Sequence, residues 1–293
     1  MTSETVKNFL GRRKKWFLWG GIIVALLCFF RYENRHLVVT EFIYVNESVE
    51  NFPDGYRIVQ ISDLHNTVFG RNHRTLMDRI TGLAPDMIVI TGDIVDSNHT
   101  DIDAAIDLVV QMAELCPVYY VTGNHEYWLD GGDRRRLFEK MEQAGAILLF
   151  NEAVTVNVSG GTFDLIGLDD KSLADDTLKV LLSECNSETL NIVLAHEPQY
   201  IENYAVADAD LVLCGHAHGG QFILPLIGPI VAPDQGFFPQ YTSGAYHMDD
   251  MTMFVSRGLG NSIIPVRLFN YPEVVCIDLA QETLSSAVPK HCR

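Results

Sequence analysis

Five apolar, strand-like runs that each end directly in metal-binding residue types constrain this sequence more than any other feature. The residues that follow these runs are Asp63 and His65, Asp93, Asn124 and His125, His196, and finally His216 and His218. Binding sites in α/β sheets lie at the carboxyl ends of strands. One polar strand end is ordinary, but five that use only Asp, Asn and His predict that these side chains share a site.

The last of these strand ends is a histidine pair on a glycine-rich turn, residues 215–220. In an extended segment, residues i and i+2 point the same way. The spacing therefore predicts that His216 and His218 face one point in space. The neighbouring glycines would let the backbone or a ligand approach closely. Cys214, beside the pair, offers an alternative as a catalytic nucleophile, although a buried structural cysteine is the commoner case.

Strand-like runs alternate with helical periodicity along the chain, which predicts an α/β layered fold. The short adjacent strands between 146 and 168 indicate mixed rather than purely parallel sheets. We find no repeat or linker and interpret residues 36–293 as one domain. The predicted strands are 37–45, 56–61, 87–91, 118–122, 146–150, 153–158, 163–168, 192–195, 211–214, 252–256 and 274–279, and the predicted helices are 71–83, 102–115, 132–144 and 176–184.

Carboxylates, imidazoles and an amide oxygen are ligands for borderline divalent metals such as Mn, Fe and Zn. The number of candidate ligands is too high for one tetrahedral zinc, which needs three or four. It suits two metals that share a bridging carboxylate, the arrangement that clamps a phosphoryl group. None of the six cysteines forms a CxxC pair, so a cysteine zinc site or a disulfide framework is not expected.

The order of these motifs resembles that of the calcineurin-like metallophosphoesterases: Asp-x-His, Gly-Asp, Gly-Asn-His-Glu, a lone His, then Gly-His-x-His. The resemblance covers nearly all of residues 55–279. Segments 219–221, 257–260 and 265–273 are similar to a bacterial membrane-associated or exported subgroup, which is close to the UDP-2,3-diacylglucosamine hydrolases of lipid A synthesis.

The resemblance implies a four-layer α/β/β/α sandwich with two mixed sheets. It also implies phosphodiester or phosphomonoester hydrolysis by a hydroxide that bridges two divalent metal ions (Mn, Fe or Zn). Asp93 would bridge the metals, and His125 would contact the phosphoryl oxygen or protonate the leaving group. The other implied ligands are Asp63, His65 and His218 for the first metal and Asn124, His196 and His216 for the second.

The roles of several other residues stay open at this stage. Glu126 is interpreted as structural, and Asp169-Asp170 as a loop cap with a substrate role as the alternative. Arg257 and Arg267 would touch substrate phosphate or form salt bridges. Four further histidines have no partner at ligand spacing and are interpreted as surface residues: His73, His99, His247 and His291.

The N-terminal segment 16–30 contains no charged residue. At 1.5 Å per residue it is shorter than the roughly 30 Å hydrocarbon core, but flanking aromatic residues and a snorkelling arginine can extend it. No small-x-small site follows, so we expect an uncleaved anchor rather than a cleaved secretory signal. A helix lying in the membrane surface is the alternative.

The chain is therefore predicted to be anchored in the cell membrane by a single pass. Its predicted parts are a basic cytoplasmic tail (1–15), a transmembrane or signal-anchor segment (16–30), a connecting segment with the first strand (31–54) and a metallophosphoesterase domain (55–293). The cluster of Lys and Arg at 12–15 favours an N-terminus in the cytoplasm and a domain outside it.

Charge is divided unevenly between the N-terminus and the rest of the chain. The first 35 residues hold seven Lys or Arg against two Asp or Glu, whereas the remainder holds fourteen against thirty-six. So acidic a body would repel a nucleic-acid backbone, and no nucleic-acid binding is expected. The expected partners are a phosphate-ester substrate, with a lipid-linked ester as one option, and the membrane.

Two other functions are weighed against a membrane-anchored phosphoesterase. One is a pyrophosphatase of the UDP-2,3-diacylglucosamine type, which would need the domain in the cytoplasm. The other is a metal-containing scaffold that binds partners without catalysis. Scaffolds of this kind tend to lose site residues, whereas this chain keeps the complete ligand set.

Overall fold

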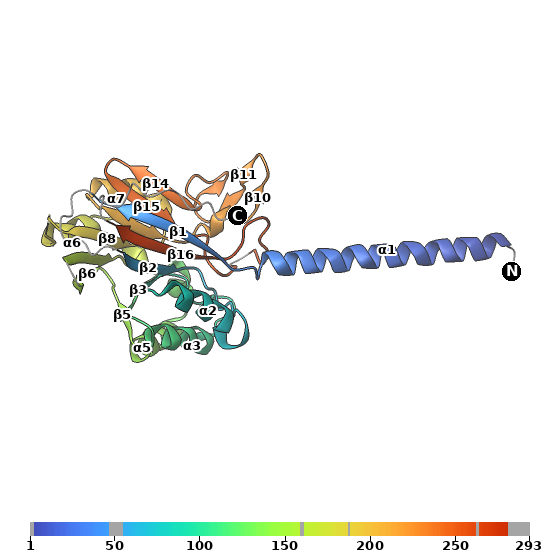
Figure 1. Ribbon diagram of the computed structural model, residues 1–293, viewed down its shortest axis with the longest axis horizontal. Helices are drawn as coiled ribbons and strands as arrows, with labels where there is room; N and C mark the ends of the chain where they lie inside the picture. Colours follow the sequence, from blue (N-terminus) through green and yellow to red (C-terminus); the bar gives the residue numbers. More distant parts are fainter. Residues whose placement is uncertain (1–2, 47–54, 159–160, 187, 262–263, 281–293) are drawn as a thin grey trace.

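The computed structural model describes residues 3–46, 55–158, 161–186, 188–261 and 264–280, with side chains from residue 16 onward. Two six-stranded sheets lie face to face at one end of a long N-terminal helix, α1 (Ser3–Glu33) (Figure 1). His291 lies outside the described residues.

The first sheet, sheet A, has the strand order β1-β16-β2-β3-β4-β5. Strands β2, β3, β4 and β5 run parallel to one another, and β16 is antiparallel to β2 and parallel to β1. The strands are β1 (Val38–Val45), β16 (Glu273–Ala280), β2 (Tyr56–Ile61), β3 (Met87–Thr91), β4 (Val118–Val121) and β5 (Ala146–Leu148).

The second sheet, sheet B, has the order β14-β15-β9-β8-β7-β6. Its four central strands are parallel, and both edge strands are antiparallel to their neighbours. The strands are β14 (Gly244–Met248), β15 (Met251–Val255), β9 (Leu211–Cys214), β8 (Leu190–Leu194), β7 (Gly161–Gly167) and β6 (Glu152–Val158). Both sheets are therefore mixed, as predicted.

Side chains from alternate positions of the central strands enter different apolar layers, because successive residues of a strand point to opposite faces. In β2, Ile58 packs between the two sheets, whereas Val59 packs beneath the helices that cover sheet A. Sheet B repeats this alternation with Ile192 and Val193. These strands are buried on both faces, which explains their nearly continuous apolar sequence.

Helices complete the outer layers and give the predicted α/β/β/α order (Figure 1). Sheet A is covered by α2 (Arg74–Leu83), α3 (Ile102–Ala113) and α5 (Gly131–Gln143). Sheet B is covered by α6 (Thr177–Glu184) and α7 (Ile201–Val206). The predicted strands and helices are present, with shorter ends in several cases.

Some elements were not predicted. These are the short helix α4 (Asn124–Trp128), α7, strand β14 and two small hairpins. The hairpins are β10 (Ile223–Leu224) with β11 (Gly228–Pro229), and β12 (Val231–Ala232) with β13 (Gly236–Phe237). None is longer than six residues, so none carries enough periodicity to be recognised.

Helix α1 includes the apolar N-terminal segment. Its window Trp16–Glu33 is long and apolar enough to cross a membrane, and only 6% of that window is buried against the rest of the chain. The helix ends in a firm contact with the domain. Glu33 is buried, and its carboxylate accepts a hydrogen bond from the backbone N–H of Phe269. The Phe29 and Phe269 rings lie 6.1 Å apart in an edge-on arrangement.

One surface prediction is wrong. His73 is only 1% exposed. It lies at the N-cap of α2 in a left-handed conformation (φ 58°) and beneath α3, and its Nε2 lies 3.2 Å from the Ala104 carbonyl oxygen. His99 and His247 are exposed, as predicted.

Candidate metal centre

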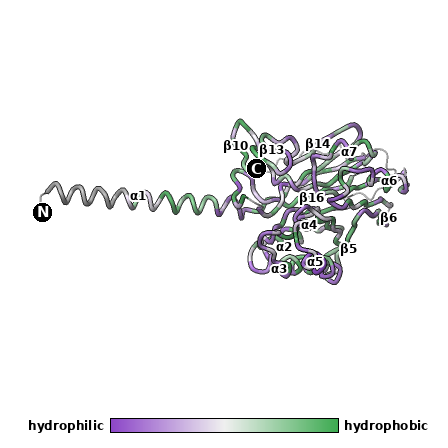
Figure 2. Tube along the Cα trace, turned by 180° about the vertical axis from the view of Figure 1, so that it is seen from behind, coloured by the Kyte–Doolittle hydropathy of each residue, from purple (hydrophilic) through white to green (hydrophobic). Residues whose placement is uncertain are grey.

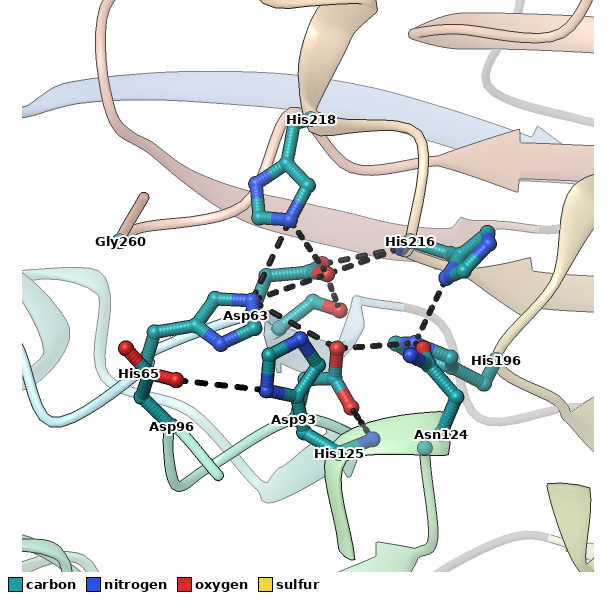
Figure 3. A network of polar contacts seen from close by, with 12 residues as sticks. Asp63, His65, Asp93, Asp96, Asn124, His125, His196, His216, His218 and Gly260 are labelled. Atoms are coloured by element: carbon teal, nitrogen blue, oxygen red, sulfur yellow. Dashed lines mark hydrogen bonds and ion pairs between the residues drawn. The ribbon is translucent and has the colours of Figure 1, made fainter. Parts of the chain in front are cut away.

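The five predicted strand ends meet where the carboxyl ends of sheet A and sheet B come together (Figure 3). Strands β2, β3 and β4 supply residues from sheet A, and β8 and β9 supply residues from sheet B. All eight predicted site residues are at most 9% exposed. They are Asp63, His65, Asp93, Asn124, His125, His196, His216 and His218.

A first group of side chains consists of Asp63, His65 and His218. The two imidazoles face each other with their Nε2 atoms 3.2 Å apart. The Asp63 Oδ1 atom lies 3.6 Å from the Nε2 of His218 and 4.0 Å from that of His65. One carboxylate oxygen and two ring nitrogens thus point into a single small space that could hold a cation.

A second group consists of Asn124, His196 and His216. The Nε2 of His196 lies 3.1 Å from the Nδ1 of His216 and 3.2 Å from the Oδ1 of Asn124. The Nδ1 of His196 donates to the Thr91 carbonyl oxygen at 2.7 Å. The Nε2 of His216 donates to the Asp234 carboxylate at 2.9 Å.

These outer bonds decide which ring atoms face the centre of the second group. Each imidazole directs one N–H outward, so the other ring nitrogen of each faces inward, toward the amide oxygen. Nitrogen and oxygen lone pairs that converge at 3.1–3.2 Å are stabilised by a positive charge between them, which a proton or a metal ion can supply. The donor set therefore fits a divalent metal. The hydrogen bonds to Thr91 and Asp234 orient the two histidines, as is usual for histidine ligands of metals.

Asp93 lies between the two groups. Its Oδ2 atom is 3.5 Å from the Nε2 of His65 and 3.4 Å from the Nε2 of His196. Its other oxygen, Oδ1, accepts a hydrogen bond from the backbone N–H of His125 at 2.9 Å. A single carboxylate oxygen thus faces both groups, which is the geometry required of a bridging ligand.

The electrostatics of the centre agree with cation binding. Burial lowers the pKa of His65 to about 4 and that of His218 well below its usual range, so both are neutral and able to bind metal at neutral pH. For His196, burial is outweighed by the Asp93 carboxylate, which raises its pKa well above the usual range. A metal ion would take the place of the proton that Asp93 attracts.

Comparison with known proteins identifies the family. Residues 56–220 match the model of the calcineurin-like phosphoesterases, which is more than half of the chain. The chain is 30% identical over 256 residues to the uncharacterized metallophosphoesterase YkuE of Bacillus subtilis, covering 85% of this chain and 88% of that protein. The chain belongs to the calcineurin-like phosphoesterase family.

Two further relatives bear on function. The phosphodiesterase YaeI of Escherichia coli is 31% identical over 229 residues, covering 76% of this chain and 82% of the relative. A zebrafish (Danio rerio) transmembrane protein with a metallophosphoesterase domain is 31% identical over 252 residues, or 80% of this chain and 56% of that protein. The protein is accordingly a metal-dependent phosphoester hydrolase, and its family uses two divalent metals.

The backbone of this phosphoesterase is in the left-handed region at five of the seven predicted ligands: Asp63, His65, Asp93, His216 and His218. The prediction that His216 and His218 face one point is therefore wrong, because the turn is not extended. His216 points into the second group and His218 into the first. Such conformations cost free energy and concentrate at functional sites.

A glycine directly before Asp93 or Asn124 could allow the backbone to turn sharply at the strand end. Gly92 has φ 84° and does so. Gly123 instead has extended backbone (φ −114°, ψ −175°), which any residue can adopt. It is needed for close approach, since a Cβ there would collide with the Asp93 carboxylate and the His196 ring.

Glu126 is a structural residue in the phosphoesterase, as predicted. Its carboxylate accepts hydrogen bonds from the backbone N–H groups of Gly123, Asp93 and Ile94 at 2.7–3.0 Å. It thereby ties the start of α4 to the loop after β3. Burial raises the pKa of Glu126 to about 8.

His125 is held between the first group and α4. Its Nδ1 accepts a hydrogen bond from the backbone N–H of Ser97 at 3.1 Å. A backbone N–H can only donate, so the neutral ring carries its proton on Nε2. The ring packs edge-on against His65, with centroids 4.5 Å apart, and against Trp128 at 4.6 Å.

Of the residues left open, Arg257 pairs with Glu273 at 2.7 Å. Arg267 is fully buried, donates to the Gly260 carbonyl oxygen and lies 3.3 Å from the Nδ1 of His218. Asp169 caps a short 3-10 helix and accepts a hydrogen bond from Tyr127. Burial raises the pKa of the Cys214 thiol well above its usual range, which disfavours a nucleophilic thiolate there.

Asp234 against His216 and Ser97 against His125 were missed. Arg267, considered in the sequence as a phosphate contact or salt-bridge partner, lies instead beside His218. Ser97 lies four residues after Asp93, so the loop after β3 could have suggested it. Nothing in the sequence near Asp234 points to His216, because the contact depends on how the two hairpins fold.

Proposed function

We propose that this protein is a membrane-anchored phosphodiesterase whose centre holds two divalent metal ions in the two groups of side chains described above. The observation that carries the proposal is the position of the Asp93 Oδ2 atom, 3.4–3.5 Å from ring nitrogens of both groups. The phosphodiesterase activity named for the Escherichia coli relative supports a diester as the substrate.

In this proposal, Asp63, His65 and His218 would hold one ion, Asn124, His196 and His216 would hold the other, and Asp93 would contribute to both. The bound ions would lower the pKa of a water molecule and absorb charge on the phosphoryl oxygens. His125 would donate a hydrogen bond from its Nε2–H to the phosphoryl oxygen or to the leaving oxygen. Thr91 and Asp234 keep the two histidines of the second group in the ligating tautomer.

The direct test measures hydrolysis of bis(p-nitrophenyl) phosphate and p-nitrophenyl phosphate by the full chain, with Mn²⁺ and with EDTA. We expect metal-dependent turnover, a higher rate on the diester, and a loss of at least 100-fold in His216→Ala. His247→Ala is the matched control, because His247 is an exposed histidine on β14. Undiminished hydrolysis in EDTA, or in His216→Ala, would contradict the proposed centre.

We also propose that α1 crosses the cell membrane once, leaves residues 1–15 in the cytoplasm, and places the domain, residues 55–293 with the strand β1 before it, outside. The Lys and Arg residues before the apolar segment support this orientation, and a transmembrane relative supports the anchor. A C-terminal alkaline phosphatase fusion should be active and a C-terminal GFP fusion dark. The reverse pattern would favour a cytoplasmic pyrophosphatase that acts on a lipid-linked nucleotide.

A further inference from the structure

Two hairpins beside the metal centre carry an unusual set of exposed apolar side chains. Leu226 is fully exposed, Ile227 is 60% exposed, Phe237 is 77% exposed and Phe238 is 69% exposed. We call these four residues the hairpin patch. Large exposed apolar patches on a protein surface mark contacts with partners or membranes.

The segment that forms the hairpins is nearly free of charge. Residues 219–246 contain a single charged residue, Asp234, in a chain in which 20% of the residues are charged. Asp234 is bonded to His216 and so is committed to the metal centre. The surface of an acidic body is therefore interrupted here by an uncharged, apolar region.

The backbone adds to this contrast. Leu226 has φ 69° and Phe238 has φ 57°, conformations that cost a bulky residue free energy and that glycine or asparagine would adopt more easily. Neither side chain offsets that cost by packing in the interior, since both are exposed. Their apolar surfaces are therefore available to a partner outside the folded chain.

The hairpin patch is connected to the end of α1. The backbone N–H of Ile223, in β10, donates to the Leu268 carbonyl oxygen at 2.9 Å. The next residue, Phe269, contacts Phe29 and Glu33 of α1. The Asn34 side chain also accepts a hydrogen bond from the backbone of Arg267 at 3.0 Å. The helix and the hairpins are thus fixed relative to each other.

Both views of the molecule place the hairpins at the end of the domain from which α1 leaves (Figures 1 and 2). Figure 2 also shows the apolar part of α1 running directly up to this end. A membrane that contains residues 16–30 therefore has its surface next to β10 and β13, and not next to α6 at the far end of the domain.

We propose that the hairpin patch inserts into the same membrane leaflet that α1 enters, so that the metal centre faces the lipid surface. Apolar and aromatic side chains of this kind bury favourably at the boundary between headgroups and acyl chains. The first hairpin begins at Ile223, five residues after His218, and Asp234 in the second hairpin hydrogen-bonds to His216. If the proposed function holds, the substrate is a phosphodiester in the headgroup of a membrane lipid.

The membrane contact can be tested without measuring activity. In full chain reconstituted into nanodiscs, Leu226→Trp should lose at least half of its added fluorescence when the acyl chains are brominated. Phe237→Trp is a second, more conservative reporter. The matched control is Val206→Trp on α7, where valine is 75% exposed, and its emission should change by less than a tenth.

Quenching of both reporters no greater than that of the control would overturn the proposal. The proposal would also be overturned if the reporter emission changed with the number of chains per nanodisc but not with bromination. The patch would then contact a second copy of the chain. These outcomes are independent of the proposed hydrolytic activity.

The substrate class is tested with the double variant Leu226→Ser/Ile227→Ser. The ratio of phosphatidylglycerol hydrolysis in vesicles to soluble bis(p-nitrophenyl) phosphate hydrolysis should fall at least five-fold, and Val206→Ser should leave it unchanged. Turnover of the soluble diester with none of the lipid would overturn the lipid substrate alone. Failure on both substrates would overturn the proposed function, while the quenching result would still decide the membrane contact.

Discussion

At the scale of single residues, the direction of one ring separates catalysis from metal binding. His125 lies against His65, but its Nδ1 is occupied by the Ser97 N–H, and the neutral ring presents a proton at Nε2. In the proposed centre the ring would therefore donate a hydrogen bond from Nε2 rather than bind metal, which is the phosphoryl contact implied by the family resemblance.

His125→Ala should lower kcat by about 10²–10³-fold, the usual range for the loss of one hydrogen-bond donor to a developing oxyanion. It should keep two metals per chain, because its side chain supplies no ligand in the proposed centre. Measuring the metal content by mass spectrometry, together with kcat, distinguishes the two roles. A loss of metal in proportion to the rate would assign His125 to the metal site and reject the donor role.

Asp93, unlike His125, is expected to be a metal ligand, since one of its oxygens faces both groups of side chains. We expect Asp93→Asn to retain less than one metal per chain and to lose at least 10³-fold in kcat/KM, because removing a shared ligand weakens both sites. Asp278→Asn is the control, as Asp278 pairs with Arg57 on the sheet. Two metals retained in Asp93→Asn would show that this carboxylate does not bridge.

At the scale of elements, the junction between β4 and α4 positions the centre. The helix begins directly after Gly123, the N–H of His125 fixes the Asp93 carboxylate, and Glu126 ties the helix to the loop after β3. A few residues therefore set the spacing between the bridging carboxylate and the second group.

One glycine substitution tests the role of that junction, and a second, far from it, serves as the control. Gly123→Ala should lose metal and at least 100-fold in activity, because its Cβ has no room beside Asp93 and His196. Gly82→Ala, in the exposed helix α2, meets no atom within 4 Å and should stabilise the fold by about 0.5–1 kcal/mol. Activity assays and thermal unfolding measure the two effects. Full activity in Gly123→Ala would show that close approach is not required.

At the scale of the whole molecule, the centre joins two sheets that are otherwise connected through an apolar interlayer. Sheet A supplies Asp63, Asp93 and Asn124, and sheet B supplies His196 and His216. Metal ions bound there would link the sheets only in the folded state, and binding to the native state alone stabilises it.

Removal of metal with EDTA should therefore lower Tm by roughly 5–10 °C, since saturation at a hundred times Kd contributes about 2.7 kcal/mol and each kcal/mol shifts Tm by about 2–4 °C in a domain of this size. Added Mn²⁺ should restore it, as differential scanning calorimetry can show. In Asp93→Asn the EDTA effect should shrink. A Tm unaffected by EDTA in the parent chain would contradict metal binding across the sheets.

The sequence by itself determined the layered α/β class and brought eight residues to one place. This succeeded because long apolar runs buried on both faces are recognisable as strands, and because the ends of parallel strands lie together. The order of the motifs also identified the family. Asp63, Asp93 and His196 needed no more than their position after a strand.

The family resemblance already implied how those side chains divide into two groups, but only the tertiary structure showed what produces the division. That division depends on left-handed backbone at His216 and His218 and on outer bonds to Thr91 and Asp234, which join residues far apart in the chain. The burial of His73 and the placement of the hairpins beside α1 likewise arise from contacts between elements. Local periodicity reports which residues avoid water, whereas such contacts are fixed only when the whole chain is packed.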